Sequence, residues 1–203
     1  MKVLDIDTWN RKQHYEHFKG LIDPYFAVTI PFNVTKAYQF SKDNGLSFFA
    51  KYLHDCMKAI NAVKALKLRI LENDVVEFDT IHASATIMRD NNTFGFSFID
   101  FNSDLSVFIK NIESEKKRIN LSDDLYPHKN GLDCIHCSAM PWLNFTGHKE
   151  PISTPFDSVP KIAFSKASKV NFLMNVSISV NHALVDGYDI GLFSEKFQDF
   201  LNA

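Results

Sequence analysis

The sequence predicts an α/β fold, a two-layer sandwich in which helices pack on one mixed β-sheet. Helical and strand-like segments alternate along most of the 203 residues. The composition is ordinary for a globular chain, with 45% hydrophobic and 23% charged residues. No repeat, low-complexity tract or linker divides the chain. We therefore expect residues 1–203 to form a single domain.

Three helices and one strand are predicted in the first part of the chain. Apolar residues at helical spacing place the helices at residues 8–19, 34–42 and 47–63. Thr8 is suited to cap the first helix, since its hydroxyl can accept a hydrogen bond from a backbone N–H. The β-rich segment 25–32 contains Pro31, which cannot donate to a neighbouring strand. This strand is therefore expected at a sheet edge.

A run of short strands, joined as a β-meander, is predicted between residues 66 and 101. Turn residues separate the strands, first at Asn73 and Asp74 and later from Asp90 to Asn92. A long amphipathic helix is expected over residues 104–120, and a loop follows it over residues 121–132.

Three strands and a helix complete the predicted fold. Alternation and β-branched residues place the strands at residues 133–140, 160–166 and 171–181. A proline-rich connection joins the first two of these strands. The final helix is expected over residues 186–201.

Composition excludes several classes of function. The 22 basic and 24 acidic residues give a net charge of −2. The chain therefore lacks the excess of basic residues that is typical of nucleic-acid-binding proteins. None of the seven glycines forms G-x-G-x-x-G or G-x-x-x-x-G-K, so glycine-rich phosphate loops are excluded. The first nine residues form no apolar signal region, and no apolar run approaches the roughly 18 residues of a membrane span. We expect a cytoplasmic protein that binds neither nucleic acid nor membrane.

The three cysteines do not form a recognisable metal or disulfide pattern. Their number is too small and odd for a disulfide scaffold. Cys134 and Cys137 enclose the sequence C-I-H-C, but residues three apart on a strand point to opposite faces of the sheet. There is also no second pair of ligands at zinc spacing. No metal is expected.

A histidine follows the last predicted strand. Apolar and polar residues alternate over 174–181, and His182 continues the apolar set, so its side chain should point inward. A neutral imidazole in a desolvated setting is a good general base, because its ordinary pKa lies near 6.5. Asp186 and Gly187 then open the final helix. A histidine buried only for packing is the alternative interpretation of this position.

Three sequence blocks resemble those of the chloramphenicol acetyltransferases, within the superfamily of acyl-CoA-dependent acyltransferases. Residues 181–187, N-H-A-L-V-D-G, resemble the histidine motif of the superfamily. Residues 9–18, W-N-R-K-Q-H-Y-E-H-F, resemble the first helix of the family, and residues 138–145, S-A-M-P-W-L-N-F, resemble an internal segment. The order and separation of the blocks fit, and the resemblance covers nearly the whole chain. It implies a chloramphenicol acetyltransferase-like fold.

The resemblance implies a CoA-dependent O-acetyltransferase, with acetyl-CoA as co-substrate and no metal. His182 stands at the position of the general base, which takes the proton of the acceptor hydroxyl as that hydroxyl attacks the thioester directly. Ser138 matches the hydroxyl that stabilises the oxyanion and contacts the cofactor. Arg11 and Asp186 match a structural pair that supports the histidine. Lys166 matches a lysine near the coenzyme A phosphate.

The resemblance also implies a homotrimer with each active site at a subunit interface. Phe18, Phe26, His148 and Glu150 are the predicted acceptor-binding residues. Members active on chloramphenicol carry apolar residues where His148 and Glu150 stand, and many carry a threonine where Ala163 stands. The expected acceptor is therefore chloramphenicol or a related small hydroxyl compound. Its identity stays open, as does the choice between antibiotic resistance and metabolism.

Two other functions fit parts of the pattern. A serine hydrolase built on Ser138 and His182 needs a strained nucleophile elbow such as G-x-S-x-G, which C-S-A-M lacks. The alternative that remains is a non-catalytic trimeric small-molecule binding protein on the same fold. Such a protein has no need for a base at His182.

Overall fold

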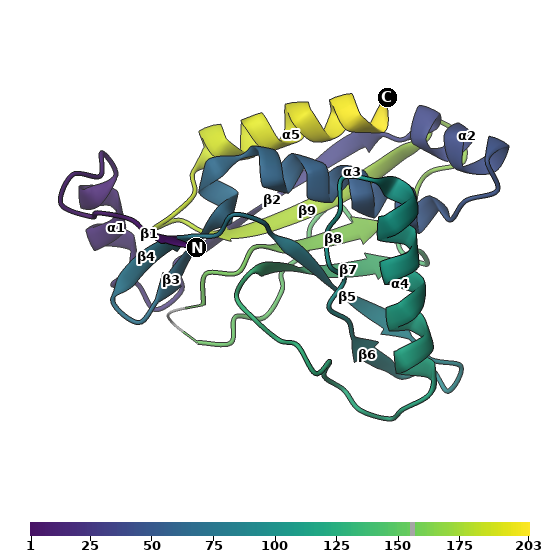
Figure 1. Cartoon of the computed structure of the whole chain (residues 1–203). Coiled ribbons are helices and arrows are strands. Elements are labelled where there is room, and N and C mark those ends of the chain that lie inside the picture. Colours follow the sequence, from purple (N-terminus) through teal and green to yellow (C-terminus); the bar gives the residue numbers. More distant parts are fainter. Residues whose placement is uncertain (155–156) are drawn as a thin grey trace.

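A six-stranded mixed sheet, with helices packed on one face, forms the body of the molecule (Figure 1). The computed structural model describes residues 1–154 and 157–203. The strands lie in the order β2-β9-β8-β7-β5-β6. They are β2 (Tyr25–Asn33), β5 (His82–Met88), β6 (Phe94–Phe96), β7 (Cys134–Met140), β8 (Lys161–Ser165) and β9 (Leu173–Asn181). β7 runs parallel to both β5 and β8, and the other neighbours are antiparallel. The predicted mixed α/β fold is confirmed.

Helices α3, α4 and α5 of the five described helices cover one face of this sheet, and α1 lies beside β1 (Lys2–Val3) at the left of Figure 1. The five helices are α1 (Lys12–Phe18), α2 (Thr35–Asp43), α3 (Phe48–Ala62), α4 (Leu105–Asn120) and α5 (Gly187–Leu201). In Figure 1, α3 and α5 lie side by side over the sheet, and α4 lies beside β6. The last three helices begin one residue after their predicted starts because Ser47, Asp104 and Asp186 act as N-caps.

The first helix is shorter than predicted. It begins at Lys12 instead of residue 8, and no side chain caps it. The Thr8 hydroxyl hydrogen-bonds to Asp5 Oδ2 at 3.0 Å, so it is engaged in the turn before the helix. The prediction of a helix starting at Thr8 was therefore wrong, because a local side-chain partner competes with the helical backbone.

The predicted meander between residues 66 and 101 is correct for the β3–β4 and β5–β6 hairpins but wrong in joining them into one sheet. β3 (Leu68–Leu71) and β4 (Asp74–Glu77) join β1 (Lys2–Val3) in a separate three-stranded sheet at the left of Figure 1. The next strand, β5, leaves them and pairs in parallel with β7. Residues 64–67 form a 3₁₀ turn, although the predicted strand begins at residue 66. Alternation identifies a strand but not its partner, so the sequence could not separate the two sheets.

The two faces of the large sheet differ in character. The even-numbered residues of β9, from Met174 to Val180, face the helices and belong to the main hydrophobic core. Pro31 lies on β2, which is an edge strand as predicted. Cys137 packs in the main core, whereas Cys134 packs with Phe98 and Val159 in a small second cluster. The two thiols therefore lie on opposite faces of β7, as their spacing predicts.

The connection between β7 and β8 crosses the face that no helix covers. Asn175 Nδ2 donates to the carbonyl oxygen of Phe145 at 2.8 Å. Ser177 Oγ lies 3.4 Å from the carbonyl oxygen of His148. Further along β9, Asn181 Nδ2 donates to the carbonyl oxygen of Asp157 at 2.9 Å. Polar side chains of β9 thus hold this connection on the sheet.

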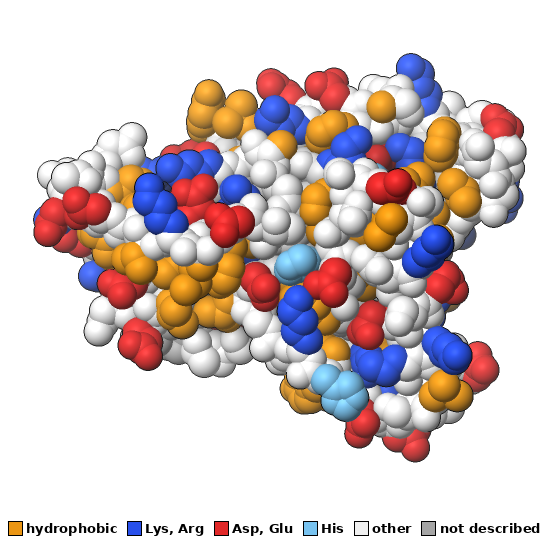
Figure 2. Space-filling view, viewed as in Figure 1, with side chains coloured by type: hydrophobic (Ala, Val, Ile, Leu, Met, Phe, Trp, Pro, Cys, Tyr) orange, Lys and Arg blue, Asp and Glu red, His pale blue; other side chains and the backbone are white. Residues whose placement is uncertain are grey.

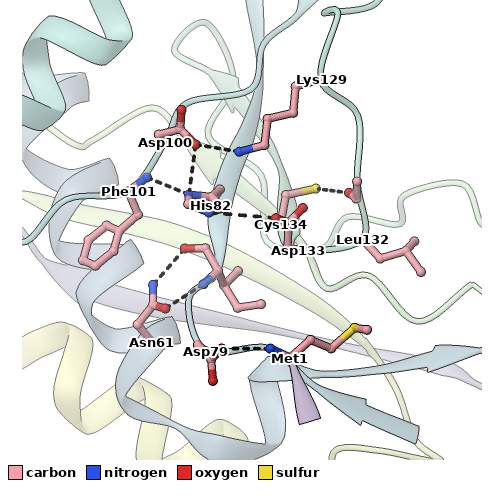
Figure 3. Close-up of polar contacts among 12 residues, drawn as sticks. Met1, Asn61, Asp79, His82, Asp100, Phe101, Lys129, Leu132, Asp133 and Cys134 are labelled. Carbon is pink, nitrogen blue, oxygen red and sulfur yellow. Dashed lines mark hydrogen bonds and ion pairs between the residues drawn. The ribbon is translucent and has the colours of Figure 1, made fainter. Parts of the chain in front are cut away.

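A polar cluster at the start of β5 joins the loop after α4 to the sheet (Figure 3). Lys129 of that loop contacts Asp100 Oδ1 at 2.8 Å, and His82 Nδ1 accepts from the Phe101 N–H at 2.9 Å. Asn61 of α3 makes two hydrogen bonds with the backbone of Ile81. The cluster ties α3, β5 and the loop together.

The surface carries both signs of charge. Figure 2 shows acidic and basic side chains interspersed over this face, while hydrophobic side chains gather over the end formed by β3 and β4. Among the described residues, no helix is both long and apolar enough to cross a membrane.

Candidate active site

His182 directly follows β9 and is held at its backbone and its ring. Its N–H donates to the carbonyl oxygen of Pro24 at 2.8 Å, and its Nδ1 lies 3.1 Å from the carbonyl oxygen of Val185. A carbonyl oxygen can only accept, so this contact places the proton on Nδ1. Nε2 then carries the free lone pair that a general base requires.

Two aromatic rings pack against the imidazole. The ring of Phe18 stacks on it at 4.0 Å between centroids, and that of Phe26 lies at 4.6 Å and is tilted. Phe18 is the last residue of α1, and Phe26 belongs to β2. Contact with two apolar rings restricts the orientation of the imidazole and reduces its contact with water.

Arg11 and Asp186 form the predicted ion pair beside His182. Arg11 Nη1 bonds to Asp186 Oδ2, and Nη2 lies 3.4 Å from the carbonyl oxygen of His182. Asp186 also caps α5 by accepting from the Tyr188 N–H at 2.9 Å. Burial raises the pKa of Asp186, but hydrogen bonds from Arg11 and Tyr188 outweigh it and hold the pKa below its ordinary value. The carboxylate therefore joins α1, the end of β9 and the start of α5.

Ser138 lies elsewhere in the same chain. It stands in the interior of β7, opposite Ala163 of β8, which in turn lies opposite Ser177 of β9. Its strand neighbours Cys137 and Ala139 face the helices, so Ser138 faces the other side of the sheet. A serine inside a regular strand is not a nucleophile elbow, which agrees with the sequence argument against a hydrolase.

Within one chain Ser138 and His182 are far apart. His182 lies five residues beyond Ser177, and Ser177 lies two strands away from Ser138. With about 3.3 Å per residue and about 4.8 Å per strand, the two residues are separated by roughly 19 Å. The structure therefore does not bring the predicted base and the predicted oxyanion donor together within a chain.

His148 and Glu150 form a half-buried pair over the Ser138 side of the sheet. His148 Nε2 lies 2.9 Å from Glu150 Oε1, and the Phe145 ring lies 5.4 Å from the His148 ring. The His148 carbonyl oxygen lies above Ser177, in the same cross-strand row as Ser138. The four predicted acceptor-binding residues thus divide into two pairs, one beside His182 and one on the side of Ser138.

A cavity of about 860 Å³ lies between the helices and the ends of β5, β7 and β8 that are remote from His182. Lys166 lines it, and Ala139, the residue after Ser138, lies on its wall. Lys116 and Lys169 also line the cavity, and sequence reasoning missed both. The three-residue spacing of Lys166 and Lys169 is a weak signal, and Lys116 belongs to a mixed run of charges that resembles an ordinary solvated helix face.

The remaining wall of the cavity is rich in aromatic and apolar side chains. The aromatic members are Tyr38, Phe48, Phe49, Tyr52, Trp142, Phe164 and Phe172. Trp142 comes from the predicted P-W segment and is 63% exposed. A long, mostly apolar cavity with lysines on its wall suits a ligand with a flexible apolar arm and an anionic end.

Comparisons with known proteins cover nearly the whole chain. A family model described as chloramphenicol acetyltransferase matches residues 1–198. The chain is 22% identical to chloramphenicol acetyltransferase 3 of Escherichia coli, over 98% of this chain and 96% of that protein. It is 24% identical to a chloramphenicol acetyltransferase of Proteus mirabilis, over 98% and 93% of the two chains.

Solved structures show the same fold. A chloramphenicol acetyltransferase superposes with a TM-score of 0.87 and 24% identity, covering 98% of this chain and 99% of that one. A probable dihydrolipoamide acetyltransferase of Listeria monocytogenes superposes with a TM-score of 0.71 and 15% identity, covering 93% and 88%. The architecture is therefore shared with acetyltransferases along its full length.

Proposed function

The chain belongs to the chloramphenicol acetyltransferase family and is an acyltransferase, and from this premise we propose that it acetylates a hydroxyl of chloramphenicol or a related small molecule with acetyl-CoA. The observation that carries the proposal is the orientation of His182. Its Nδ1 is engaged by the Val185 carbonyl oxygen, so Nε2 is the basic nitrogen, and two phenylalanine rings hold the imidazole in place.

The proposed reaction is a direct transfer. Nε2 of His182 takes the proton of the acceptor hydroxyl as the hydroxyl oxygen attacks the thioester carbonyl carbon. The Ser138 hydroxyl donates to the oxyanion that forms, and a donor of this kind contributes about 2.7–4 kcal/mol to the barrier reduction. When the tetrahedral intermediate collapses, the carbon–sulfur bond breaks, and the imidazolium returns its proton to the departing thiolate.

This chemistry requires two chains. His182 and Ser138 are separated by roughly 19 Å within a chain, so the base of one subunit has to face the Ser138 of another. We therefore propose a homotrimer with a site at each interface. Phe18 and Phe26 then approach the acceptor from the His182 side, and His148 and Glu150 approach it from the Ser138 side.

The cavity beside Lys166 supports the assignment of acetyl-CoA. Its apolar wall suits the pantetheine arm, and Lys116, Lys166 and Lys169 can contact the phosphates as point charges. Ala139 lies on the wall next to Ser138 in the chain, but the Ser138 side chain faces the other side of β7, so the thioester end has to extend beyond the cavity to reach the Ser138 hydroxyl. This arrangement needs no glycine-rich loop, which agrees with the composition.

The His148–Glu150 pair bears on the choice of acceptor. The pair is half-buried, with side chains 24% and 23% exposed, and it lies on the proposed acceptor side. A buried polar pair favours an acceptor with its own hydrogen-bonding groups, since an apolar ligand would leave the pair poorly solvated. We therefore propose that the acceptor is more polar at this end than a purely aromatic compound.

We also propose that the protein acts in the cytoplasm. Cys56, Cys134 and Cys137 are free and buried, which fits a reducing compartment such as the cytoplasm. A role in antibiotic resistance depends on whether chloramphenicol is an acceptor.

The test follows thiol release from acetyl-CoA with a panel of hydroxylated acceptors that includes chloramphenicol. We expect at least one acceptor to give saturable thiol release that His182→Ala abolishes. Ser138→Ala should lower kcat by about 100- to 1,000-fold with little change in KM. Saturable acceptor binding without thiol release from any compound contradicts acetyl transfer.

A further inference from the structure

Asp157 and Lys161 form a buried ion pair that the proposed reaction does not use. Lys161 Nζ lies 2.7 Å from Asp157 Oδ2, and the two side chains are only 5% and 4% exposed. Asp157 belongs to the connection that crosses the open face of the sheet, and Lys161 is the first residue of β8. Buried charges are costly unless further hydrogen bonds satisfy them.

Asp157 has such hydrogen bonds on both carboxylate oxygens. Oδ1 accepts from the Tyr25 hydroxyl at 3.0 Å and from the Val159 N–H at 3.1 Å. Oδ2 accepts from the Ser153 hydroxyl at 3.0 Å and from the Ser153 N–H at 3.2 Å. Burial raises the pKa of Asp157, but Lys161 and these donors outweigh it and lower the pKa to about 2. The carboxylate is therefore held as an anion.

A second buried pair shows that this arrangement is specific. Lys51 and Asp55 of α3 have the same four-residue spacing, the same 2.7 Å distance and side chains that are 8% and 1% exposed. There burial outweighs Lys51 and raises the pKa of Asp55. Asp157 differs because three additional residues donate to it.

The Asp157 group is connected to His182 through Asn181. Asn181 Nδ2 donates to the Asp157 carbonyl oxygen at 2.9 Å, and Asn181 Oδ1 accepts from the Ala183 N–H at 2.9 Å. The side chain of Asn181 thus fixes the residues on both sides of His182. Tyr25, which contacts Asp157, also lies opposite Asn181 in the β2–β9 register and follows Pro24, the backbone partner of His182.

We propose that Asp157 and Lys161 are positioning residues for His182, which act through the side chain of Asn181. Arg11 and Asp186 hold His182 from the side of α5. The Asp157–Lys161 pair holds His182 from the side of β9. The pair fixes the connection on the sheet, the connection presents the Asp157 carbonyl oxygen to Asn181, and Asn181 fixes the backbone of His182. This inference rests on the proposed role of His182 as the base.

The decisive variant is Asp157→Asn combined with Lys161→Met, which removes both charges with little change in volume. Replacing both partners of a buried pair by hydrophobic residues of similar volume is often neutral or stabilising. Asparagine is used at position 157 because its oxygen can still accept from Tyr25 and Val159, so the variant should fold. We expect an unchanged melting temperature, an unchanged KM for acetyl-CoA and a kcat lowered by about 10- to 100-fold, because a small misplacement of a reacting group has effects of this size. The matched control, Asp55→Asn with Lys51→Met, should leave kcat unchanged.

The route through Asn181 is tested with a double-mutant cycle. If the pair acts through Asn181, the neutral pair variant should have little further effect on kcat in an Asn181→Ala background. Fully multiplicative effects, or a kcat of the folded neutral pair variant equal to that of the wild type, overturn the proposal.

A second readout does not depend on catalysis. Nitrogen NMR of labelled histidine should show His182 as the Nδ1–H tautomer in the wild type and as a mixture in the neutral pair variant. An unchanged His182 spectrum overturns the positioning role even if no acceptor is ever acetylated. Absence of thiol release with a changed spectrum instead contradicts the proposed reaction and leaves the positioning role standing.

Discussion

Ser138 lies in β7 and His182 directly follows β9 of the same sheet, and the register of β7, β8 and β9 keeps them roughly 19 Å apart within a chain. No rotation of side chains closes such a gap, and the strands between them are hydrogen-bonded along their length. Each residue nevertheless has its own surroundings suited to part of one reaction. Phe18 and Phe26 pack against His182, and Ala139, the residue after Ser138, lines the large cavity that we propose for acetyl-CoA.

A shared site predicts complementation between two inactive variants. His182→Ala retains a functional Ser138, and Ser138→Ala retains a functional His182. In a trimer assembled from an equal mixture, about one quarter of the interfaces receive both intact residues, if assembly is random and cyclic. We therefore expect co-expressed variants to regain about a quarter of the wild-type activity, measured as acceptor-dependent thiol release.

The control for this experiment is mixing the two separately purified variants without dissociation, which should restore little activity. Sedimentation of the co-expressed sample should give a trimer. A site contained in one chain would give no recovery at all, and recovery in a sample that sediments as a monomer would contradict the interface.

The second prediction concerns Asp186, which has two separable roles. Asp186→Asn keeps the N-cap of α5, since asparagine is a good cap, but it removes the charge that pairs with Arg11. Asp186→Ala removes both, and loss of the cap should add about 1 kcal/mol of destabilisation. Urea unfolding should rank the proteins as wild type, Asn variant and Ala variant in decreasing stability.

Both variants of Asp186 should also lower kcat, because Arg11 Nη2 contacts the His182 carbonyl oxygen only weakly at 3.4 Å and depends on Asp186 for its position. Tyr188→Ala is a suitable control, since the exposed Tyr188 contributes only its backbone N–H to Asp186. Equal stability of the Asn and Ala variants would exclude the capping role.

The third prediction concerns the lysines of the cavity. Lys166→Ala and Lys169→Ala should raise KM for acetyl-CoA and leave kcat nearly unchanged, because contacts with the phosphates are equally strong in the ground state and the transition state. The effect should shrink at high salt, where such contacts are screened. Trp142 on the cavity wall provides a direct signal, since its fluorescence should change when coenzyme A is added.

In this experiment Trp142→Phe should lose the fluorescence change while Trp9 remains as the second tryptophan. Lys36→Ala, on α2 outside the cavity wall, is the matched lysine control. A lower kcat at unchanged KM in the Lys166 variant would remove that residue from cofactor binding.

The predictability of this fold differed between elements for physical reasons. α3, α4 and α5 were located closely because each combines an apolar stripe with an N-cap residue, Ser47, Asp104 or Asp186. The edge position of β2 followed from Pro31. Strand partners were not predictable, and β3 and β4 were wrongly joined to β5, because alternation describes the faces of a strand and not its neighbours.

The residues of the candidate site also differed in how well the sequence predicted them. The position of His182 and the pairing of Arg11 with Asp186 followed from sequence blocks, and the structure places these residues together. The support from Asp157 and Lys161 was not visible, because both residues lie in or beside a proline-rich connection with no periodicity. Their partners are close only through the register of β2, β8 and β9.

The last prediction concerns His82 and the stability of the protein in mild acid. His82 Nδ1 accepts from the Phe101 N–H at 2.9 Å, so the ring is neutral with its proton on Nε2 (Figure 3). Burial, and then the charge of Lys129, lower the pKa of His82, and Asp100 and Asp133 oppose them. Protonation of the ring removes the acceptor of Phe101, so the folded protein resists it.

A lowered histidine pKa means that the unfolded chain binds the proton first as pH falls. The contribution of His82 to the free energy of unfolding is therefore fully present above its unfolded pKa of about 6.5. It declines as pH falls below this value, until the pKa of the folded state is passed.

His82→Asn retains an acceptor for the Phe101 N–H but does not titrate. We expect the free energy of unfolding of this variant to decline less between pH 7.5 and pH 5.5 than that of the wild type, both measured by urea denaturation. His54 and His136, whose pKa values are also lowered chiefly by burial, contribute to the remaining slope. Equal slopes for the wild type and His82→Asn would show that His82 titrates alike in the folded and unfolded chain.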